Sequence, residues 1–134
     1  MDEAIRAKIL ELLEQHRIMT VATNRPDGWP QATTVGYVNY GLTIYFLCSP
    51  RSQKAQNISR DNRVSLTIDH DTDDPMAITG LSMAAHAQPV SDQNERAKAL
   101  GLLVKRYPEY AAFPPPKPEE IMIMRVVPKL ISVL

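Results

Sequence analysis

Apolar residues recur at helical spacing in two stretches of this chain. The first predicts an amphipathic helix over residues 2–16, with an apolar stripe formed by Ile5, Ile9, Leu12 and Leu13. The second predicts a helix of about 15 residues that Ser91 caps and Pro108 ends, because proline cannot continue a helical ladder. Its expected inner face comprises Ala97, Leu100, Leu103, Val104 and Tyr107.

Elsewhere the apolar residues alternate or form continuous runs, which predicts β-strands. Residues 42–48 are apolar apart from Thr43, so we expect this strand to be buried on both faces. Gly80 marks the place where a bulge would fit in a long strand, and Pro128 separates two final strands. The predicted strands cover residues 18–23, 31–38, 42–48, 63–69, 76–90, 121–127 and 130–134.

Turn residues join these segments closely. Residues 25–28 supply proline and glycine for one turn, and residues 39–41 are expected to close a hairpin. Ser49 and Pro50 match the cap and the first residue of a short helix that runs to about Arg60. Hairpins or single short helices therefore connect most strands, which favours antiparallel pairing.

The expected fold is mainly β, with six or seven mostly antiparallel strands and three flanking helices in a single domain over residues 1–134. So many strands in a small chain usually close into a barrel, because closure removes the exposed edges.

Composition narrows the classes of function. The chain has 15 basic and 15 acidic residues, and this balance argues against broad attraction to nucleic acid or to anionic membranes. A single-strand-binding barrel is a weak alternative, because only two Phe, five Tyr and one Trp are available as stacking platforms. The lone cysteine excludes an internal disulfide, and no apolar run approaches the roughly 18 residues of a membrane span. We expect a soluble, cytoplasmic protein.

The corner after residues 42–48 carries the clearest chemical signal. Free N–H groups at a helix start attract anions, and Arg51, Ser52 and Lys54 add two cations and a hydroxyl there. This pattern predicts a phosphate-binding site. The alternative is an ordinary capped surface helix whose cations are solvated.

Two other features favour structural interpretations. Cys48 has no histidine or acid near it in sequence, so we interpret it as a small buried hydrophobe and not as a nucleophile. His70 lies among four aspartates, but the spacing does not match an EF-hand loop, so a solvated loop is expected and no metal site.

These features together resemble the pyridoxamine 5′-phosphate oxidase-like superfamily of flavin-binding split barrels. The resemblance rests on the order of the leading helix, the Asn24–Gly28 turn, Pro30, the hairpin, Ser52-x-Lys54 and the segment from Asn57 to Val64. It implies a split β-barrel, a homodimer, and FMN bound at the dimer interface. Some relatives use the deazaflavin F420 instead, and a few bind haem.

The resemblance also implies particular cofactor contacts. Thr33, Thr34 and Val35 match the strand that lines the flavin ring and its tail, although β-branched residues are ordinary strand formers as well. Cys48 and Ser49 match the neighbouring strand end beside the ring. The phosphate-binding turn corresponds to Ser52, Gln53 and Lys54, with Arg51 as a second cation.

Two departures separate the chain from the oxidases that give the superfamily its name. Those enzymes carry an arginine where this chain has Thr33, and a C-terminal segment with tryptophan and arginine that holds pyridoxal phosphate. Here the only tryptophan is Trp29, near the opposite end. The sequence therefore argues against true pyridoxamine phosphate oxidase activity.

The leading hypothesis is an FMN-dependent oxidoreductase of unknown substrate, with F420 as the alternative cofactor. No convincing set of catalytic side chains is visible, which fits chemistry performed by the cofactor. A non-enzymatic flavin, F420 or haem binder would show the same sequence features.

Overall fold

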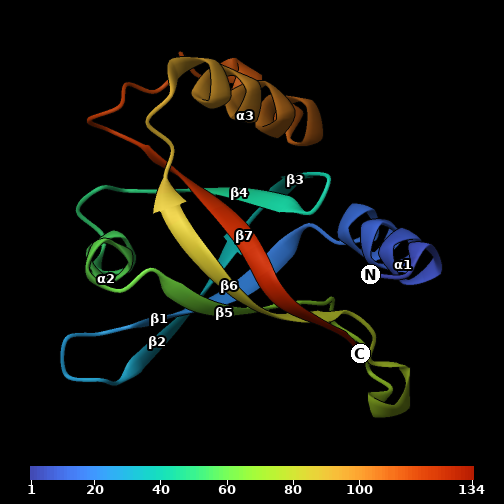
Figure 1. Ribbon diagram of the computed structural model, residues 1–134. Helices are drawn as coiled ribbons and strands as arrows, with labels where there is room; N and C mark the ends of the chain where they lie inside the picture. The colour runs from blue at the N-terminus through green and yellow to red at the C-terminus, as the bar shows by residue number, and fades with distance from the viewer.

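The computed structural model describes residues 1–134 and contains one curled antiparallel sheet with three α-helices (Figure 1). The helices are α1 Glu3–Gln15, α2 Gln53–Arg60 and α3 Gln93–Arg106, and two 3₁₀ turns are η1 Pro75–Ala77 and η2 Pro108–Ala112. The strands are β1 Ile18–Asn24, β2 Pro30–Gly36, β3 Val38–Tyr40, β4 Thr43–Cys48, β5 Arg63–Ile68, β6 Leu81–Pro89 and β7 Met122–Val133.

The seven strands follow the order β2-β1-β5-β6-β7-β4-β3, and every neighbouring pair is antiparallel. The sheet curls into a half-barrel, so that the edge strand β2 comes close to β4. This arrangement confirms the predicted split barrel. It also leaves one edge of β2 without a hydrogen-bonded neighbouring strand at the opening.

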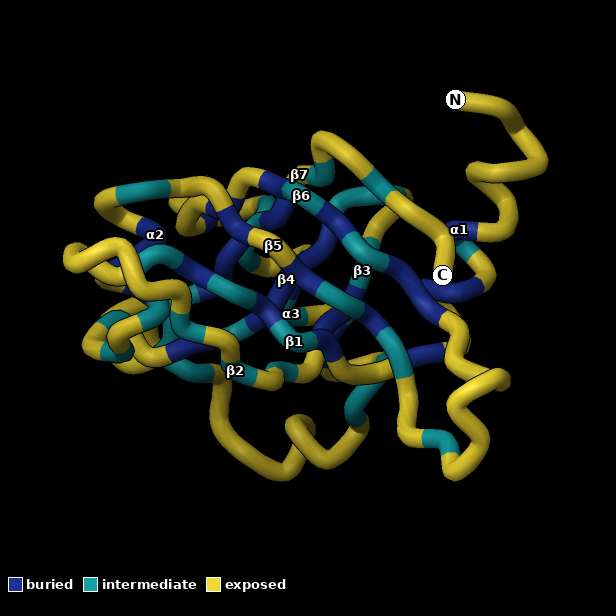
Figure 2. Tube along the Cα trace, turned by 90° about the horizontal axis from the view of Figure 1, so that it is seen from below, coloured by how far each residue is buried: buried dark blue, intermediate teal, exposed yellow.

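Alternation along the strands decides which side chains enter the core. On β5, Val64, Leu66 and Ile68 are buried, whereas Ser65 and Thr67 point outward (Figure 2). The main core lies inside the half-barrel and includes residues from α1, α2 and five strands. The outer side of β3, β4 and β7 packs on α3 through a second cluster, formed by Val38, Tyr45, Val90, Ala99, Leu103 and Ile123.

Several predicted strand boundaries were wrong. The stretch 31–38 is interrupted because the Tyr37 N–H bonds to Arg17 O and the Tyr107 hydroxyl and not to a ladder partner. The stretch 76–90 begins its strand only at Leu81, after a 3₁₀ turn and Gly80. Gly80 has φ +155°, and a Cβ there would lie 2.0 Å from Ile68 O.

The C-terminal stretch forms one strand, not two. Pro128 is tolerated because a register shift between Ala84 and Ala85 produces a bulge, with Ala85 opposite Pro128. The bulge therefore lies in β7, where Lys129 is the extra residue, and not at Gly80.

The cap and inner face of α3 also differ from the prediction. The cap is Asp92, one residue later than expected, because its carboxylate accepts from the Glu95 N–H at 2.8 Å. Ala97 and Val104 are exposed, while Ala99 is buried instead.

None of the helices is long and apolar enough to cross a membrane.

Candidate cofactor site

The corner between β4 and α2 is a hydrogen-bonded turn followed by a capped helix. The Ser52 N–H donates to Ser49 O at 3.0 Å, and the Ser49 hydroxyl accepts from the Arg51 N–H at 3.2 Å. The actual cap is Ser52, not Ser49, because the Ser52 hydroxyl accepts from the Ala55 N–H at 3.1 Å. Ser52 also donates to Ser49 O at 2.7 Å, so its hydroxyl already has two partners within the chain.

The helix start leaves backbone donors available. The N–H groups of Gln53 and Lys54 have no partner among the backbone or side-chain hydrogen bonds of the structure. Both belong to the first turn of α2, where the helix dipole favours an anion. The Lys54 side chain is half-buried, with its Nζ 5.9 Å from the centroid of the buried Phe46 ring on β4. This corner therefore offers backbone and lysine donors to an anion.

Cys48 ends β4 directly before this turn and is buried. Burial raises the pKa of the Cys48 thiol, while the nearby Ser52 hydroxyl and Lys54 ammonium act in the opposite direction. The thiol is neutral at ordinary pH, which agrees with its interpretation as a packing residue.

The three candidate residues of β2 do not share a face. Thr33 and Val35 are half-buried on the inner side, opposite Val21 and Met19 of β1. Thr34 is exposed on the outer side, where its Oγ1 lies 3.5 Å from Thr20 Oγ1. A single ligand in the opening would meet the side chains of the inner row and, along the free edge of the strand, its backbone.

Two buried polar atoms on that inner row lack partners. They are Thr33 Oγ1 and Gln31 Oε1. Native structures pair most buried polar atoms, so an unpartnered pair on one strand face indicates a place for a ligand. A third such atom, Asn39 Oδ1, lies on β3, outside the corner.

A polar chain ties the base of α2 to the barrel wall. Gln53 Nε2 donates to Asn57 Oδ1 at 2.8 Å, and Asn57 Nδ2 donates to Thr23 Oγ1 at 3.0 Å. Thr23 pairs with Gln31 across β1 and β2. The sequence prediction missed Gln31 and Thr23, although Gln31 is two residues before Thr33 and period-two alternation places both on one face.

A ligand with a phosphate and several hydroxyls would fit this corner, because both kinds of group find free partners here. Free N–H groups and Lys54 suit a phosphate, and Thr33 and Gln31 offer unpaired oxygens to hydroxyls. Hollows of about 670, 610 and 400 Å³ lie elsewhere on the chain, and no predicted cofactor residue lines them.

Residues 5–132 match the family model described as pyridoxamine 5′-phosphate oxidase. Since the match spans nearly the whole chain, this protein belongs to the pyridoxamine 5′-phosphate oxidase family, in agreement with the resemblance seen in the sequence. No curated protein matches the chain.

Solved structures share the fold at low sequence identity. A protein of Listeria innocua, provisionally named a pyridoxamine 5′-phosphate oxidase, is 22% identical with a TM-score of 0.79, over 97% of this chain and 98% of its own. The haem storage protein HutZ of Vibrio cholerae gives 19% and 0.79, over 95% and 92%. An FAD-binding protein of Mesorhizobium loti gives 15% and 0.73, over 95% and 91%. These likenesses establish the split-barrel fold.

Proposed function

We propose that this protein binds FMN in the opening between β2 and β4 and acts as a flavin-dependent oxidoreductase. The observation that carries the proposal is the start of α2, where two backbone N–H groups are free and Lys54 adds a cation in the same turn. The cofactor phosphate would bind there, with Arg51 as a second cation. The exposed turn would leave the phosphate in contact with water at one side.

The rest of the cofactor would extend along β2. Thr33 and Gln31 supply buried oxygens without partners, which suit the hydroxyls of a ribityl chain. The half-buried Val35 on the same inner row supplies an apolar side chain for a ring. The flavin itself supplies hydride or electron transfer when bound, and these residues bind it, orient it and exclude water.

The opening would be completed by a second copy, so the proposed functional unit is a cytoplasmic homodimer. The family resemblance supports the dimer, and so does the edge of β2 that has no neighbouring strand beside the corner.

A flavin titration tests the phosphate assignment. FMN fluorescence should be quenched on binding, and Lys54→Ala should weaken the affinity about tenfold, since a charge-assisted contact contributes about 1.5 kcal/mol or more. Lys117→Ala is the matched control, because Lys117 is exposed in a different segment. Equal affinity of the two variants for FMN would contradict the phosphate site. Parallel titrations with F420 would show whether the protein binds a deazaflavin instead.

A turnover assay distinguishes an enzyme from a protein that only carries the cofactor. An oxidoreductase should have its bound flavin reduced by NAD(P)H and reoxidised by an acceptor. A cofactor that stays oxidised with every donor would indicate a binding or sensor protein. Because HutZ of Vibrio cholerae is a haem storage protein, a haem titration that gave a Soret shift while FMN did not bind would assign the chain to haem.

A further inference from the structure

A surface hollow of about 400 Å³ lies where the C-terminal ends of α1 and α3 meet the edge strand β3 (Figure 1). We call it the helix-end site; its lining comes from residues 14–17, 38–39 and 102–106. Arg106, the last residue of α3, joins the two helices by donating to Leu13 O at 3.1 Å. The volume is in the range of small-molecule sites, and the hollow shares no residue with the cofactor corner.

The lining of the helix-end site is basic. It includes Arg17, Lys105 and Arg106, together with a single acid, Glu14. Arg17 and Lys105 are exposed, and their side chains make no hydrogen bond or ion pair in the chain. Glu14 forms no ion pair with any of the three cations. Three cations and one acid leave an excess of two positive charges around the hollow.

Arg106 is held in place by the fold. Its Nη2 donates to the carbonyls of Leu13 and His16, and its Cζ lies 4.9 Å from the centroid of the Tyr37 ring. Its Nη1 has no hydrogen-bond partner. Cations in the last turn of a helix also offset the helix dipole, which gives Arg106 and Lys105 a structural role. That role does not explain the next feature of the hollow.

Asn39 on β3 brings an unpartnered oxygen to the helix-end site. Its Oδ1 is buried and has no hydrogen-bond partner, whereas its Nδ2 donates to Gly41 O at 3.0 Å. Only the nitrogen of a side-chain amide donates, so this bond fixes which end of the amide is the oxygen. Native proteins pair most buried polar atoms. Oδ1 therefore marks a place for an O–H or N–H donor from outside the chain.

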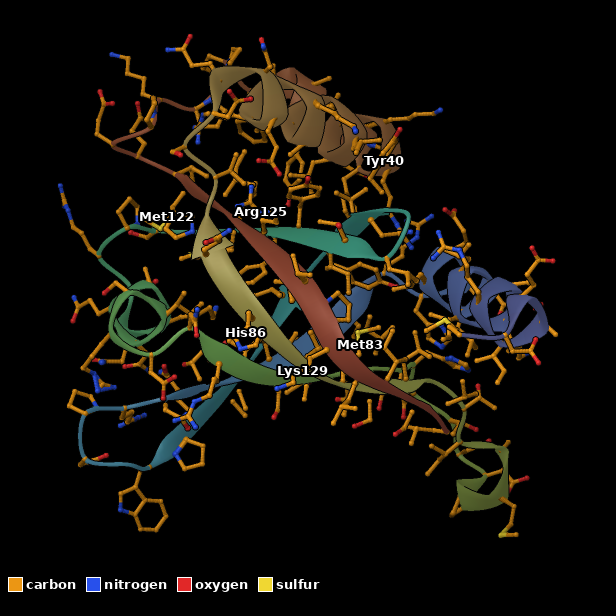
Figure 3. The ribbon with its side chains drawn as sticks, in the orientation of Figure 1. Tyr40, Met83, His86, Met122, Arg125 and Lys129 are labelled. Atoms are coloured by element: carbon orange, nitrogen blue, oxygen red, sulfur yellow. The ribbon has the colours of Figure 1, made fainter.

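The walls of the helix-end site are preformed. The side chain of Tyr40 lies against α3 (Figure 3), with Lys98 Nζ 3.1 Å from the centroid of its ring. Val38 is buried in the cluster beneath α3, and Leu102 packs against the same cluster. A ligand would therefore meet charges and an acceptor that are already held by the fold, and little ordering would oppose its binding.

We propose that the helix-end site binds a phosphate monoester of a small aliphatic alcohol that carries a further hydroxyl. At neutral pH such a phosphate has a charge of about −1.5 to −2, which matches the excess of two positive charges. The phosphate would accept from Arg17, Lys105 and the free Nη1 of Arg106, since these groups are the usual donors to phosphate. The hydroxyl would donate to Asn39 Oδ1. The site does not depend on the proposed flavin.

The lining selects this ligand class over others. No aromatic side chain lines the hollow, so a nucleotide base would find no stacking partner there. A monocarboxylate would neutralise only one of the two positive charges, and sulfate carries no donor for Asn39. Val38 and Leu102 are the only apolar residues of the lining, which suits a short carbon chain.

Isothermal titration calorimetry tests the site with two phosphate monoesters, glycerol 3-phosphate and methyl phosphate, at about pH 8, where both are dianions. Arg17→Ala and Lys105→Ala should each raise both dissociation constants about tenfold, because each change removes a charge-assisted contact. Asn39→Ala should raise that of glycerol 3-phosphate about fivefold and leave that of methyl phosphate unchanged, since methyl phosphate has no further hydroxyl. Lys54→Ala, at the cofactor corner, is the control and should change neither. Circular dichroism confirms that each variant is folded.

Nuclear magnetic resonance locates the bound ligand directly. Glycerol 3-phosphate added to ¹⁵N-labelled protein should shift the side-chain amide signal of Asn39 and the backbone amide signals of Leu102 and Lys105. The signals of Gln53 and Lys54 should stay in place. Shifts confined to Gln53 and Lys54 would overturn the helix-end site and assign the phosphate to the cofactor corner.

The remaining outcomes are equally decisive. No shift and no heat at millimolar concentrations of either ligand would overturn the helix-end site while leaving the proposed flavin site standing. An equal effect of Asn39→Ala on both ligands would overturn the contact between the hydroxyl and Oδ1. Failure of FMN to bind, with the shifts at Asn39 and Lys105 intact, would contradict the proposed function alone.

Discussion

Buried polar groups have hydrogen-bond partners at one end of the half-barrel, whereas two of them lack partners at the other end. At the end closed by α1, the Tyr37 hydroxyl is shared between Leu13 O at 2.7 Å and His16 O at 2.9 Å. Arg106 also donates to the carbonyls of Leu13 and His16, and the Tyr107 hydroxyl lies 2.7 Å from Arg17 O. At the opening between β2 and β4, Thr33 and Gln31 keep buried oxygens with no partner. The hydrogen-bonded groups at the closed end indicate a structural role, and the unpartnered oxygens at the opening indicate a binding role.

His16 shows how thoroughly the closed end is satisfied. Its side chain is buried, with Nδ1 2.7 Å from Leu12 O and Nε2 2.8 Å from His70 Nδ1. Since Nδ1 donates to the carbonyl, Nε2 accepts from His70 in the neutral pair. The sequence offered no partner for His16, because His70 is 54 residues away along the chain.

The largest effect on stability should come from the closed end. Tyr37→Phe removes the hydroxyl and leaves buried carbonyls of α1 with fewer donors, so the free energy of unfolding should fall by about 1–3 kcal/mol. Urea denaturation measures the change. Tyr110→Phe is the control, because Tyr110 is exposed and its hydroxyl has no partner. A stability equal to that of the control would contradict a structural role for this network.

At the opening, removal of a hydroxyl should raise the free energy of unfolding instead of lowering it. Thr33→Val replaces a buried hydroxyl that has no partner by a methyl group of the same shape, so the ligand-free protein should gain up to about 1 kcal/mol. FMN affinity should fall about fivefold, because one hydrogen bond of about 1 kcal/mol is lost. Thr34→Val, whose hydroxyl is exposed, should give no such gain in stability. A loss of stability in Thr33→Val would show that the hydroxyl is satisfied within the protein.

The smallest effect is expected from a surface cluster beside α2, where polar groups are paired but exposed. Arg63 and Asn24 donate to the Asp61 carboxylate and hold the pKa of Asp61 well below its usual range. A depressed pKa contributes stability above the ordinary carboxyl pKa and loses it as the pH falls through the folded value. Asp61→Asn should therefore flatten the decline of the urea midpoint between pH 5 and pH 2. If the urea midpoint declined over this pH range as it does in the wild type, the ion pair would be fully screened by solvent.

Local chemistry along the chain was enough to predict the helices, six of the strand positions and the corner after β4. Period-two alternation in β5 and the apolar run of β4 need no tertiary information, because each side chain's face follows from backbone geometry. The family resemblance likewise depended on the order of short local motifs, and the family match over residues 5–132 confirms it.

Only the tertiary structure decided the features that depend on partners distant in sequence. Tyr37 interrupts a strand because Arg17 and Tyr107 compete for its N–H. Pro128 remains within one strand because a bulge against β6 absorbs the missing donor. The free oxygens of Thr33 and Gln31 are likewise a property of the folded chain, since a side chain lacks a partner only relative to everything packed around it.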